Sequence, residues 1–374
     1  MSCSTPDIYI GLMSGTSLDA IDVALVNFSN SQAPQLMLAR NWSIPSVLRV
    51  QIENLCQPSG DEINRMGELD VQIGELFAEA VLSALQETGI SAAQVRAIGS
   101  HGQTIRHHPF RSSPFTLQIG DPNTIAFRTG ITTVADFRRM DIAAGGQGAP
   151  LVPAFHDAVL RSEKENRAIV NIGGMANITV LAKNFPVSGF DTGPGNVLMD
   201  AWIQKHLQQT HDAEGRWARS GQGHETLLNK LLSHPYFSLP APKSTGREMF
   251  HLAWLESQLL DMGEIKTEDV QRTLLELTAR SIALAIEQQP AAAIDRVLLC
   301  GGGSHNALLC ERIAELLPQS QLGSTTDFGV PADWLEAMAF AWLAKQRMEG
   351  KTSNAPAVTG ASRPCVLGGV HLPS

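Results

Sequence analysis

The sequence predicts an α/β protein made of two related domains. The chain has 374 residues, and chains longer than about 250 residues usually divide into domains because a single core stops growing. Each half opens with an apolar strand, a turn of small residues and an alternating strand, at residues 9–26 and 168–181. Alternation at period two after a glycine-containing turn is typical of a β-hairpin. The two hairpins therefore indicate an internal duplication of one fold unit.

The first half continues with strands and helices in alternation. Residues 36–40 are predicted to form a third antiparallel strand, and residues 61–87 carry apolar side chains at helical spacing, with Gly89 suited to the helix end. Short buried strands are predicted further on, at residues 95–100, 117–119 and 131–135. Polar side chains follow the last of these strands, where ligands of open α/β sheets bind.

A glycine-rich stretch at residues 145–148 marks the predicted boundary between the domains. The first domain then spans residues 1–145 and the second spans residues 146–374, with the extreme C-terminus free to pack back on the first domain.

The second half repeats the alternation of strands and helices. Residues 215–242 are rich in Gly, Pro and polar residues and are predicted to be irregular. The helix predicted at 334–348 is apolar almost all round and should be buried. Three further helices are predicted at residues 197–207, 267–287 and 306–316, and a strand is predicted at residues 296–300.

Composition and charge narrow the class of protein. The net charge of −9 argues against a surface for nucleic acid or an anionic membrane. No stretch reaches the roughly 18 apolar residues of a membrane span, and the N-terminus lacks the basic start and apolar run of a secretory signal. Five cysteines, none spaced as CxxC, favour reduced thiols over disulfides or a zinc site. We therefore expect a cytoplasmic protein.

The turn of the first hairpin is a candidate phosphate-binding loop. No bulky side chain occurs between Ser14 and Ser17, so backbone amides and hydroxyls can approach phosphate oxygens closely. No Lys follows the glycines, which excludes a Walker A loop, and a strand follows where a Rossmann fingerprint needs a helix. The alternative is a plain connection between strands, although a two-residue turn would suffice for that.

A triple glycine, Gly301–Gly303, lies between a predicted strand and a predicted helix. Bare backbone there can accommodate a flat ring or a phosphate, and the helix N-terminus favours anions. The alternative is a simple turn in which Asn306 caps the helix.

Asp191 is the main catalytic candidate. It follows an apolar strand and precedes a Gly-Pro-Gly turn, so its carboxylate should project from a rigid strand end and can act as a general base. The alternative is a turn aspartate that bonds its own backbone. Asp19 is a candidate ligand of Mg²⁺ through water, or else a solvated residue at a strand start.

Several further polar residues are candidates for contacts with a substrate. Arg138 and Arg139 either hold an anionic group or pair with the nearby Asp136 and Asp141. Glu336 lies near the start of the apolar helix, where the helix dipole alone would favour a carboxylate. Three histidines lack the spacing of a helical zinc site and are interpreted as loop residues, with a substrate contact expected only from the first: His101, His107 and His108.

Taken together, the motifs closely resemble those of the anhydro-N-acetylmuramic acid kinase family. They run in order through nearly the whole chain: GLMSGTSLD at 11–19, SHGQT at 100–104, QIGD at 118–121, ADFRR at 135–139, GGQGAPL at 145–151, NIGGMAN at 171–177, FDTGPGN at 190–196 and GGGSHN at 301–306. The family usually has Gly where this chain has Ala20, which is a small change.

The resemblance implies the fold of actin, the sugar kinases and the heat-shock ATPases. In that fold two related ribonuclease-H-like domains, each with a mixed five-stranded sheet, surround a central nucleotide cleft. It also implies ATP and Mg²⁺, a homodimer, and 1,6-anhydro-N-acetylmuramic acid as the substrate, a sugar released in peptidoglycan turnover. The family opens the anhydro bridge with water and phosphorylates the freed O6, giving N-acetylmuramic acid 6-phosphate.

The resemblance also assigns roles to residues. Asp191 matches the general base, and Asp19 would contact the metal. Contacts with the sugar are expected from Ser14, His101, Arg138, Arg139 and Glu336. Nucleotide contacts are expected from Gly15, Thr16, Ser17, Leu18, Asp19, Ala20, Ile21, Asp22, Gly173, Gly174, Asn177, Gly301, Gly302, Gly303 and Asn306.

Two other functions remain alternatives. A different sugar kinase of the same fold would use Asp191 to deprotonate a hydroxyl instead of water. A non-catalytic nucleotide switch, like actin or a chaperone, would use ATP to move domains for a protein partner.

Overall fold

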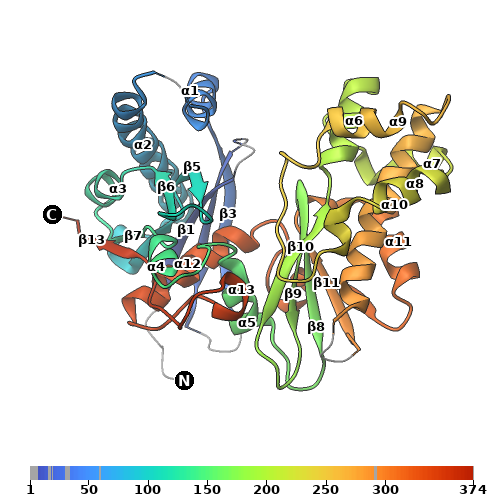
Figure 1. Cartoon of the computed structure of the whole chain (residues 1–374). Coiled ribbons are helices and arrows are strands. Elements are labelled where there is room, and N and C mark those ends of the chain that lie inside the picture. Colours follow the sequence, from blue (N-terminus) through green and yellow to red (C-terminus); the bar gives the residue numbers. More distant parts are fainter. Residues whose placement is uncertain are drawn as a thin grey trace. The chain divides into compact units, whose positions relative to one another are not determined.

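A computed structural model describes residues 7–15, 18, 20–29, 34–58, 60–289 and 293–373 of the chain. It divides into two compact units. The first unit comprises Met1–Val159 together with Trp334–Ser374, and the second comprises Leu160–Asp333 (Figure 1). Each unit has its own α/β architecture.

The first unit is built on a six-stranded sheet in the order β13-β7-β4-β1-β2-β3. Its strands are β1 (Ile8–Ser14), β2 (Ala20–Asn27), β3 (Gln35–Ser43), β4 (Val95–Ser100), β7 (Thr133–Ala135) and β13 (Gly369–His371). A separate hairpin joins β5 (Gln103–His108) to β6 (Phe115–Ile119). The helices are α1 (Ser46–Cys56), α2 (Glu62–Thr88), α3 (Pro122–Thr129), α4 (Arg139–Ala143), α5 (Val152–Leu160), α12 (Leu335–Met348) and α13 (Pro356–Thr359).

The second unit is built on a five-stranded sheet in the order β10-β9-β8-β11-β12. Its strands are β8 (Arg167–Ile172), β9 (Met175–Leu181), β10 (Ser188–Pro194), β11 (Arg296–Cys300) and β12 (Gln321–Ser324). The helices are α6 (Val197–Leu207), α7 (Arg216–Ser220), α8 (Glu225–Leu232), α9 (Leu252–Leu259), α10 (Thr267–Glu287) and α11 (Ala307–Leu316).

The two sheets share one topology. In the first unit β1, β2 and β3 form an antiparallel meander, and β4 and then β7 join the other side in parallel. In the second unit β8, β9 and β10 form the meander, and β11 and β12 join in parallel. The predicted α/β class, with two related mixed sheets, is confirmed. The first sheet gains a sixth strand because β13 pairs antiparallel with β7.

The two faces of β1 carry different side chains. Ile8, Ile10 and Leu12 point into a core that includes apolar residues of α2. The opposite face presents Gly11, where a Cβ atom would overlap the backbone carbonyl of Ala337 on α12. Helix α12 therefore approaches the sheet more closely than a larger side chain on β1 would allow. The predicted burial of this helix is confirmed, since most of its apolar residues are buried.

Three local expectations differ from the structure. The second unit is shorter than the predicted range 146–374, because α5 and the segment from Trp334 onward belong to the first unit. Residues 215–242 were predicted to be irregular but contain α7 and α8; Leu227, Leu228 and Leu231 of α8 are buried. His107 and His108 lie on strand β5, not in a loop.

Within the described part of the chain, no helix combines the length and the apolar composition needed to cross a membrane.

Candidate active site

Asp191 lies on β10, the edge strand of the second sheet, opposite Asn177 of β9. The register of the two strands shifts directly after Asp191, so the strand is irregular at this position. Burial, with a smaller contribution from the nearby Glu248, raises the pKa of the Asp191 carboxyl from 3.8 to about 6, against the lowering effect of the hydrogen bond from Thr245. A carboxyl with this pKa is mostly ionised near neutral pH and still basic enough to accept a proton.

Three contacts from one distant segment hold Asp191 in place. The backbone N–H of Thr245 donates to Oδ2 at 3.0 Å. The backbone N–H of Asp191 donates to the carbonyl of Lys243 at 3.0 Å. The buried Tyr236 donates its hydroxyl to the carbonyl of Asp191 at 2.5 Å. Sequence reasoning missed Tyr236, Lys243 and Thr245 because they carry no recognisable motif. Tyr236 lies in the stretch 215–242 that was expected to be irregular, and the other two follow it directly.

The turn of the second hairpin is tied to the start of α6. The N–H groups of Gly195 and Val197 donate to the carbonyl of Gly174, and that of Asn196 donates to the carbonyl of Gly173. A Cβ atom on Gly195 would overlap the carbonyl of Gly173. The turn and the motif that contains Asp191 are thus joined through their backbones. Around Gly174 itself a Cβ atom would meet nothing within 4 Å, so its surface is open.

The triple glycine follows β11 and faces the same turn. Gly301 has a φ of +76°, and a Cβ atom there would overlap the side-chain oxygen of Asn171. A Cβ atom on Gly303 would overlap the side chain of Ile172, whereas Gly302 is open. The side-chain oxygen of Asn306 accepts from the N–H of Leu309 at 3.1 Å, so the expected helix cap exists beside the glycines.

A cavity of about 580 Å³ lies next to these glycines. We call it the α6–α11 cavity; its lining includes Asn196, Asp200, His211, Asp212, Gly302–Gly303 and Asn306. Its volume is in the range of small-molecule sites. Burial raises the pKa of Asp200 to about 6, with His211 and Arg247 opposing the rise. Asp212 accepts hydrogen bonds from the N–H groups of Trp217 and Ala218 at 2.9 Å each and so anchors α7.

In the first unit, two predicted substrate residues and a third side chain form one buried network. The hydroxyl of Ser14 donates to Oε1 of Gln103 at 2.6 Å. Nδ1 of His101 lies 3.2 Å from the carbonyl of Ser14. Burial and Arg138 lower the pKa of His101 to about 3, so the ring is neutral, with its Nδ1–H donating to Ser14. Gln103 belongs to the SHGQT motif, but its role was not predicted.

Arg138 extends this network by contacting Nε2 of His101. Its Nη2 lies 2.8 Å from Nε2 of His101 and its Nη1 donates to the carbonyl of Gly148 at 2.8 Å. Burial lowers the pKa of Arg138 to about 10, and Glu336 and Asp141 oppose the fall. The pKa of Glu336 is raised by burial and by Asp22, while Arg138 lowers it. The structure thus brings together four of the predicted substrate residues: Ser14, His101, Arg138 and Glu336.

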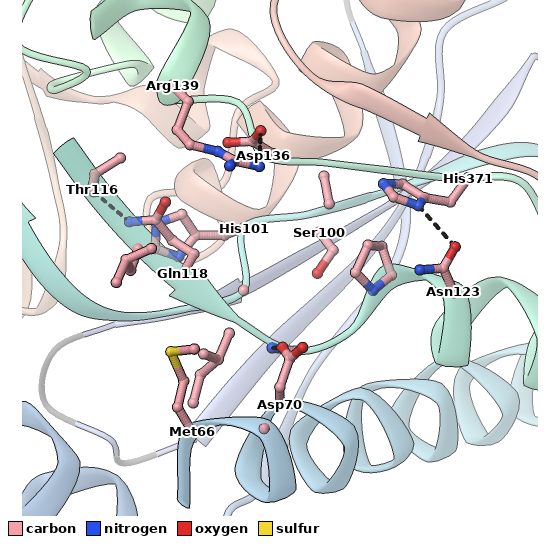
Figure 2. Close-up of a pocket in the computed structure, with 17 residues that line it drawn as sticks. Met66, Asp70, Ser100, His101, Thr116, Gln118, Asn123, Asp136, Arg139 and His371 are labelled. Carbon is pink, nitrogen blue, oxygen red and sulfur yellow. Dashed lines mark hydrogen bonds and ion pairs between the residues drawn. The ribbon is translucent and has the colours of Figure 1, made fainter. Parts of the chain in front are cut away.

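Arg139 lies apart from that network. It forms an ion pair with Asp136 at 2.6 Å, and its side chain is 65% exposed. The sequence left open whether Arg139 holds an anionic group or pairs with a nearby aspartate, and the structure contains the pair with Asp136. Both residues line a second cavity of about 320 Å³ in the first unit, together with Ser100 and His101 (Figure 2). We call it the Ser100 cavity.

The turn of the first hairpin is only partly described. Three of its predicted ligand residues, Thr16, Ser17 and Asp19, lie outside the described residues. The N–H of Leu18 donates to the carbonyl of Gly15 at 3.3 Å. The side chain of Ile21 is fully buried in the core, so only its backbone is available to a ligand. The carboxylate of Asp22 accepts a hydrogen bond from Asn41 at 2.6 Å, and Ala20 begins β2.

Comparisons with known proteins show which family this site belongs to. The model of the family described as anhydro-N-acetylmuramic acid kinase matches residues 7–373. A protein named anhydro-N-acetylmuramic acid kinase from Shewanella denitrificans is 53% identical over 98% of this chain and 98% of its own length. One of the same name from Saccharophagus degradans is 52% identical over 98% of this chain and 100% of its own length. The resemblance predicted from the motifs is confirmed, and the chain belongs to the anhydro-N-acetylmuramic acid kinase family.

Proposed function

We propose that this kinase opens the 1,6-anhydro bridge of 1,6-anhydro-N-acetylmuramic acid with water and transfers the γ-phosphoryl group of ATP to O6. The product is N-acetylmuramic acid 6-phosphate. Family membership over nearly the whole chain supports this reaction. The coupling is chemically necessary, since the bridged sugar has no free 6-hydroxyl to phosphorylate.

The observation that carries the proposal is the environment of Asp191. Its carboxylate is fixed at a strand edge by Thr245 and has a pKa of about 6. We assign it as the general base that accepts a proton from the water attacking the anomeric carbon. The water oxygen bonds to that carbon, and the bond from the carbon to O6 breaks. O6 then attacks the γ-phosphorus of ATP, whose bond to the β,γ-bridging oxygen breaks so that ADP leaves. A buried carboxylate whose orientation is fixed by a hydrogen bond suits this role, because its surroundings need little reorganisation during the reaction.

Nucleotide binding is assigned to the glycine turns. The open backbone at Gly174 and Gly302 supports close approach of ATP, and the α6–α11 cavity beside Gly302–Gly303 has room for part of it. We also assign nucleotide contacts to Gly173, Asn177 and Gly301. Because the side-chain oxygen of Asn306 caps α11, we assign this residue to holding the turn as well as to nucleotide contact.

The first hairpin turn, Gly15–Asp22, is assigned to the phosphates. Its backbone and hydroxyl donors would stabilise the charge on the transferred group, which is the main work in phosphoryl transfer. We propose Mg²⁺ as the metal and Asp19 as its protein contact through water. Among the described residues no group of three or more His, Cys, Asp or Glu side chains is placed to hold a metal. Mg²⁺ bound by one or two carboxylates and phosphate oxygens does not require such a group.

We assign sugar binding to the first unit. Ser14 and His101 present polar atoms fixed by Gln103 and Arg138, and Glu336 and Arg139 supply charged groups. We also propose that the enzyme is a cytoplasmic homodimer acting in peptidoglycan recycling, on the strength of the family alone.

The test measures ATP turnover with anhydro-N-acetylmuramic acid and with free hexoses side by side. We expect rapid ADP release only with the anhydro-sugar, which also excludes a nucleotide switch. Asp191→Asn should lower turnover by about a hundredfold to ten-thousandfold, the usual contribution of a general base, while ATP binding survives. Turnover of Asp191→Asn within a few-fold of wild type would refute the assignment of the base, and an equal rate with free hexoses would refute the substrate.

A further inference from the structure

Asp141 of α4 is a charged residue to which the proposed mechanism gives no role. It is fully buried in the first unit. A carboxylate is stable in such a place only when hydrogen-bond donors or cations replace the water that it loses. The partners of Asp141 therefore show what this charge does in the fold.

Three donors converge on the carboxylate of Asp141. The backbone N–H of Gly148 donates to Oδ2 at 2.8 Å. The side-chain amide of Asn354 and the hydroxyl of Thr359 donate to Oδ1 at 2.7 and 2.8 Å, from 213 and 218 positions later in the chain. Helix α13, which ends at Thr359, therefore lies beside α4 (Figure 1). The carboxylate thus joins the loop that follows α4 to the C-terminal part of the first unit.

The loop Gly145–Gly148 is folded around this carboxylate. The N–H of Gly146 donates to the backbone carbonyl of Asp141 at 2.9 Å, and the N–H of Gln147 donates to the carbonyl of Thr359 at 2.8 Å. A Cβ atom on Gly146 would lie 2.3 Å from Oδ2 of Asp141, so the loop approaches more closely than a larger residue would allow. The loop is therefore held both by α4 and by the C-terminal part of the chain.

The same loop holds the guanidinium of Arg138. The carbonyl of Gly148 accepts a hydrogen bond from Nη1 at 2.8 Å, and Nη2 lies 2.8 Å from Nε2 of His101. The N–H and the carbonyl of one residue, Gly148, thus link the carboxylate of Asp141 to this guanidinium. The charge of Asp141 also favours the cation, since burial lowers the pKa of Arg138 to about 10 while Glu336 and then Asp141 oppose the fall.

The contacts run in one chain from Asp141 to the residues assigned to the sugar. Resting on the function proposed above, we infer that Asp141 is a positioning residue for sugar binding. It fixes Gly148, whose carbonyl holds Arg138 against His101. The two donors from the C-terminal part of the chain orient the carboxylate in turn, so they serve the site without touching the substrate.

Asp141→Asn tests this role, because an amide has one oxygen where the carboxylate has two. Its NH₂ group must face either the N–H of Gly148 or the donors on the other side, and the loop loses part of its support. We expect the KM for anhydro-N-acetylmuramic acid to rise about tenfold, the weight of a hydrogen bond to a charged group, while kcat and the KM for ATP stay near wild type. Thr359→Val removes one donor and keeps the carboxylate, so its KM should rise less.

A double-mutant cycle shows whether Asp141 acts through Arg138. Arg138→Met removes the guanidinium donors and should raise the KM for the sugar at least as much as Asp141→Asn does. In that background Asp141→Asn should add little, because the two residues act as a unit. A merely structural role would raise the KM by the same factor in both backgrounds.

Nitrogen-15 spectra of the histidine-labelled protein without substrates give a readout that does not depend on activity. The ring of His101 is neutral, and its Nε2 faces the guanidinium of Arg138, so loss of that contact changes the nitrogen shift. The signal is identified by its absence in His101→Gln. Asp141→Asn and Arg138→Met should move it in the same direction.

Glu276→Gln is the matched control. Glu276 is also a buried carboxylate, but it accepts hydrogen bonds from Arg272 and Arg312 in the second unit. Its variant should keep both the KM for the sugar and the His101 signal.

Three results would each overturn the role of Asp141: an unchanged KM for the sugar in Asp141→Asn, equal factors in the two backgrounds, or an unmoved His101 signal. If Asp141→Asn does not fold, Thr359→Val is judged by the same three measurements. A wild type inactive toward the anhydro-sugar would instead refute the proposed function, and the His101 signal would still decide whether Asp141 positions Arg138.

Discussion

Asp191 is an unusual carboxylate because its surroundings change its acidity. The sequence predicted that it projects from the end of a strand, but the structure places it within β10, directly before the shift in register with β9. Its pKa of about 6 depends on burial and on Glu248 and Thr245, which are far along the chain. No local pattern could reveal these partners, so the raised pKa of this carboxyl could not be predicted from the sequence.

The same environment makes the ionised form of Asp191 destabilising to the folded protein. Its pKa rises from 3.8 to about 6, so the folded protein keeps this proton to a higher pH than the unfolded chain does. The stabilising contribution is present in full below about pH 4 and is lost as the pH rises through about 6. Above that pH the ionised carboxylate lowers the free energy of unfolding by about 3 kcal/mol, from a pKa change of about two.

Asp191→Asn should therefore be more stable than wild type at high pH although it is inactive. We expect its free energy of unfolding to exceed that of wild type by about 1–3 kcal/mol near pH 8, and the difference to vanish near pH 4. Urea unfolding at both pH values measures this. Asp261→Asn, at an exposed position, is the control and should show no gain. A loss of stability for Asp191→Asn near pH 8 would contradict the account.

At the scale of single elements, helix α12 shows what a sequence pattern can and cannot reveal. The all-round apolar composition predicted its burial, which the structure confirms. How closely the helix approaches the sheet depends on Gly11 of β1 and Gly99 of β4. A Cβ atom at either position would overlap a backbone carbonyl of the helix. The contacting residues are more than two hundred positions apart in the sequence, so local periodicity could not predict these contacts. Helix α12 also carries Glu336, so the close approach fixes the position of this proposed sugar contact.

Gly11→Ala should lower the free energy of unfolding by more than about 3 kcal/mol, because the added methyl group meets backbone that cannot move aside. Thermal and urea unfolding measure the effect. The control is Gly67→Ala on α2, where a Cβ atom would meet nothing within 4 Å. That variant should gain about 0.5–1 kcal/mol from the higher helix propensity of Ala. Equal stability of Gly11→Ala and wild type would show that α12 packs differently.

At the scale of the whole molecule, the duplication was predictable because each half opens with its own hairpin. The shared order of the two sheets confirms it. The return of the chain to the first unit was harder to predict in detail, since β13 is only three residues long and lies beyond any strong pattern. The first unit therefore needs both ends of the chain, and the second unit is inserted between them.

The central claim is that water opens the bridge while phosphate is transferred, and oxygen-18 water tests it most directly. The reaction is run in labelled water, stopped early, and reduced at once with borohydride so that the anomeric oxygen no longer exchanges. Unlabelled N-acetylmuramic acid 6-phosphate, incubated in parallel, corrects for spontaneous exchange. We predict one labelled oxygen at the anomeric carbon of the product and none in its phosphate. Product without label at the anomeric carbon would contradict the account.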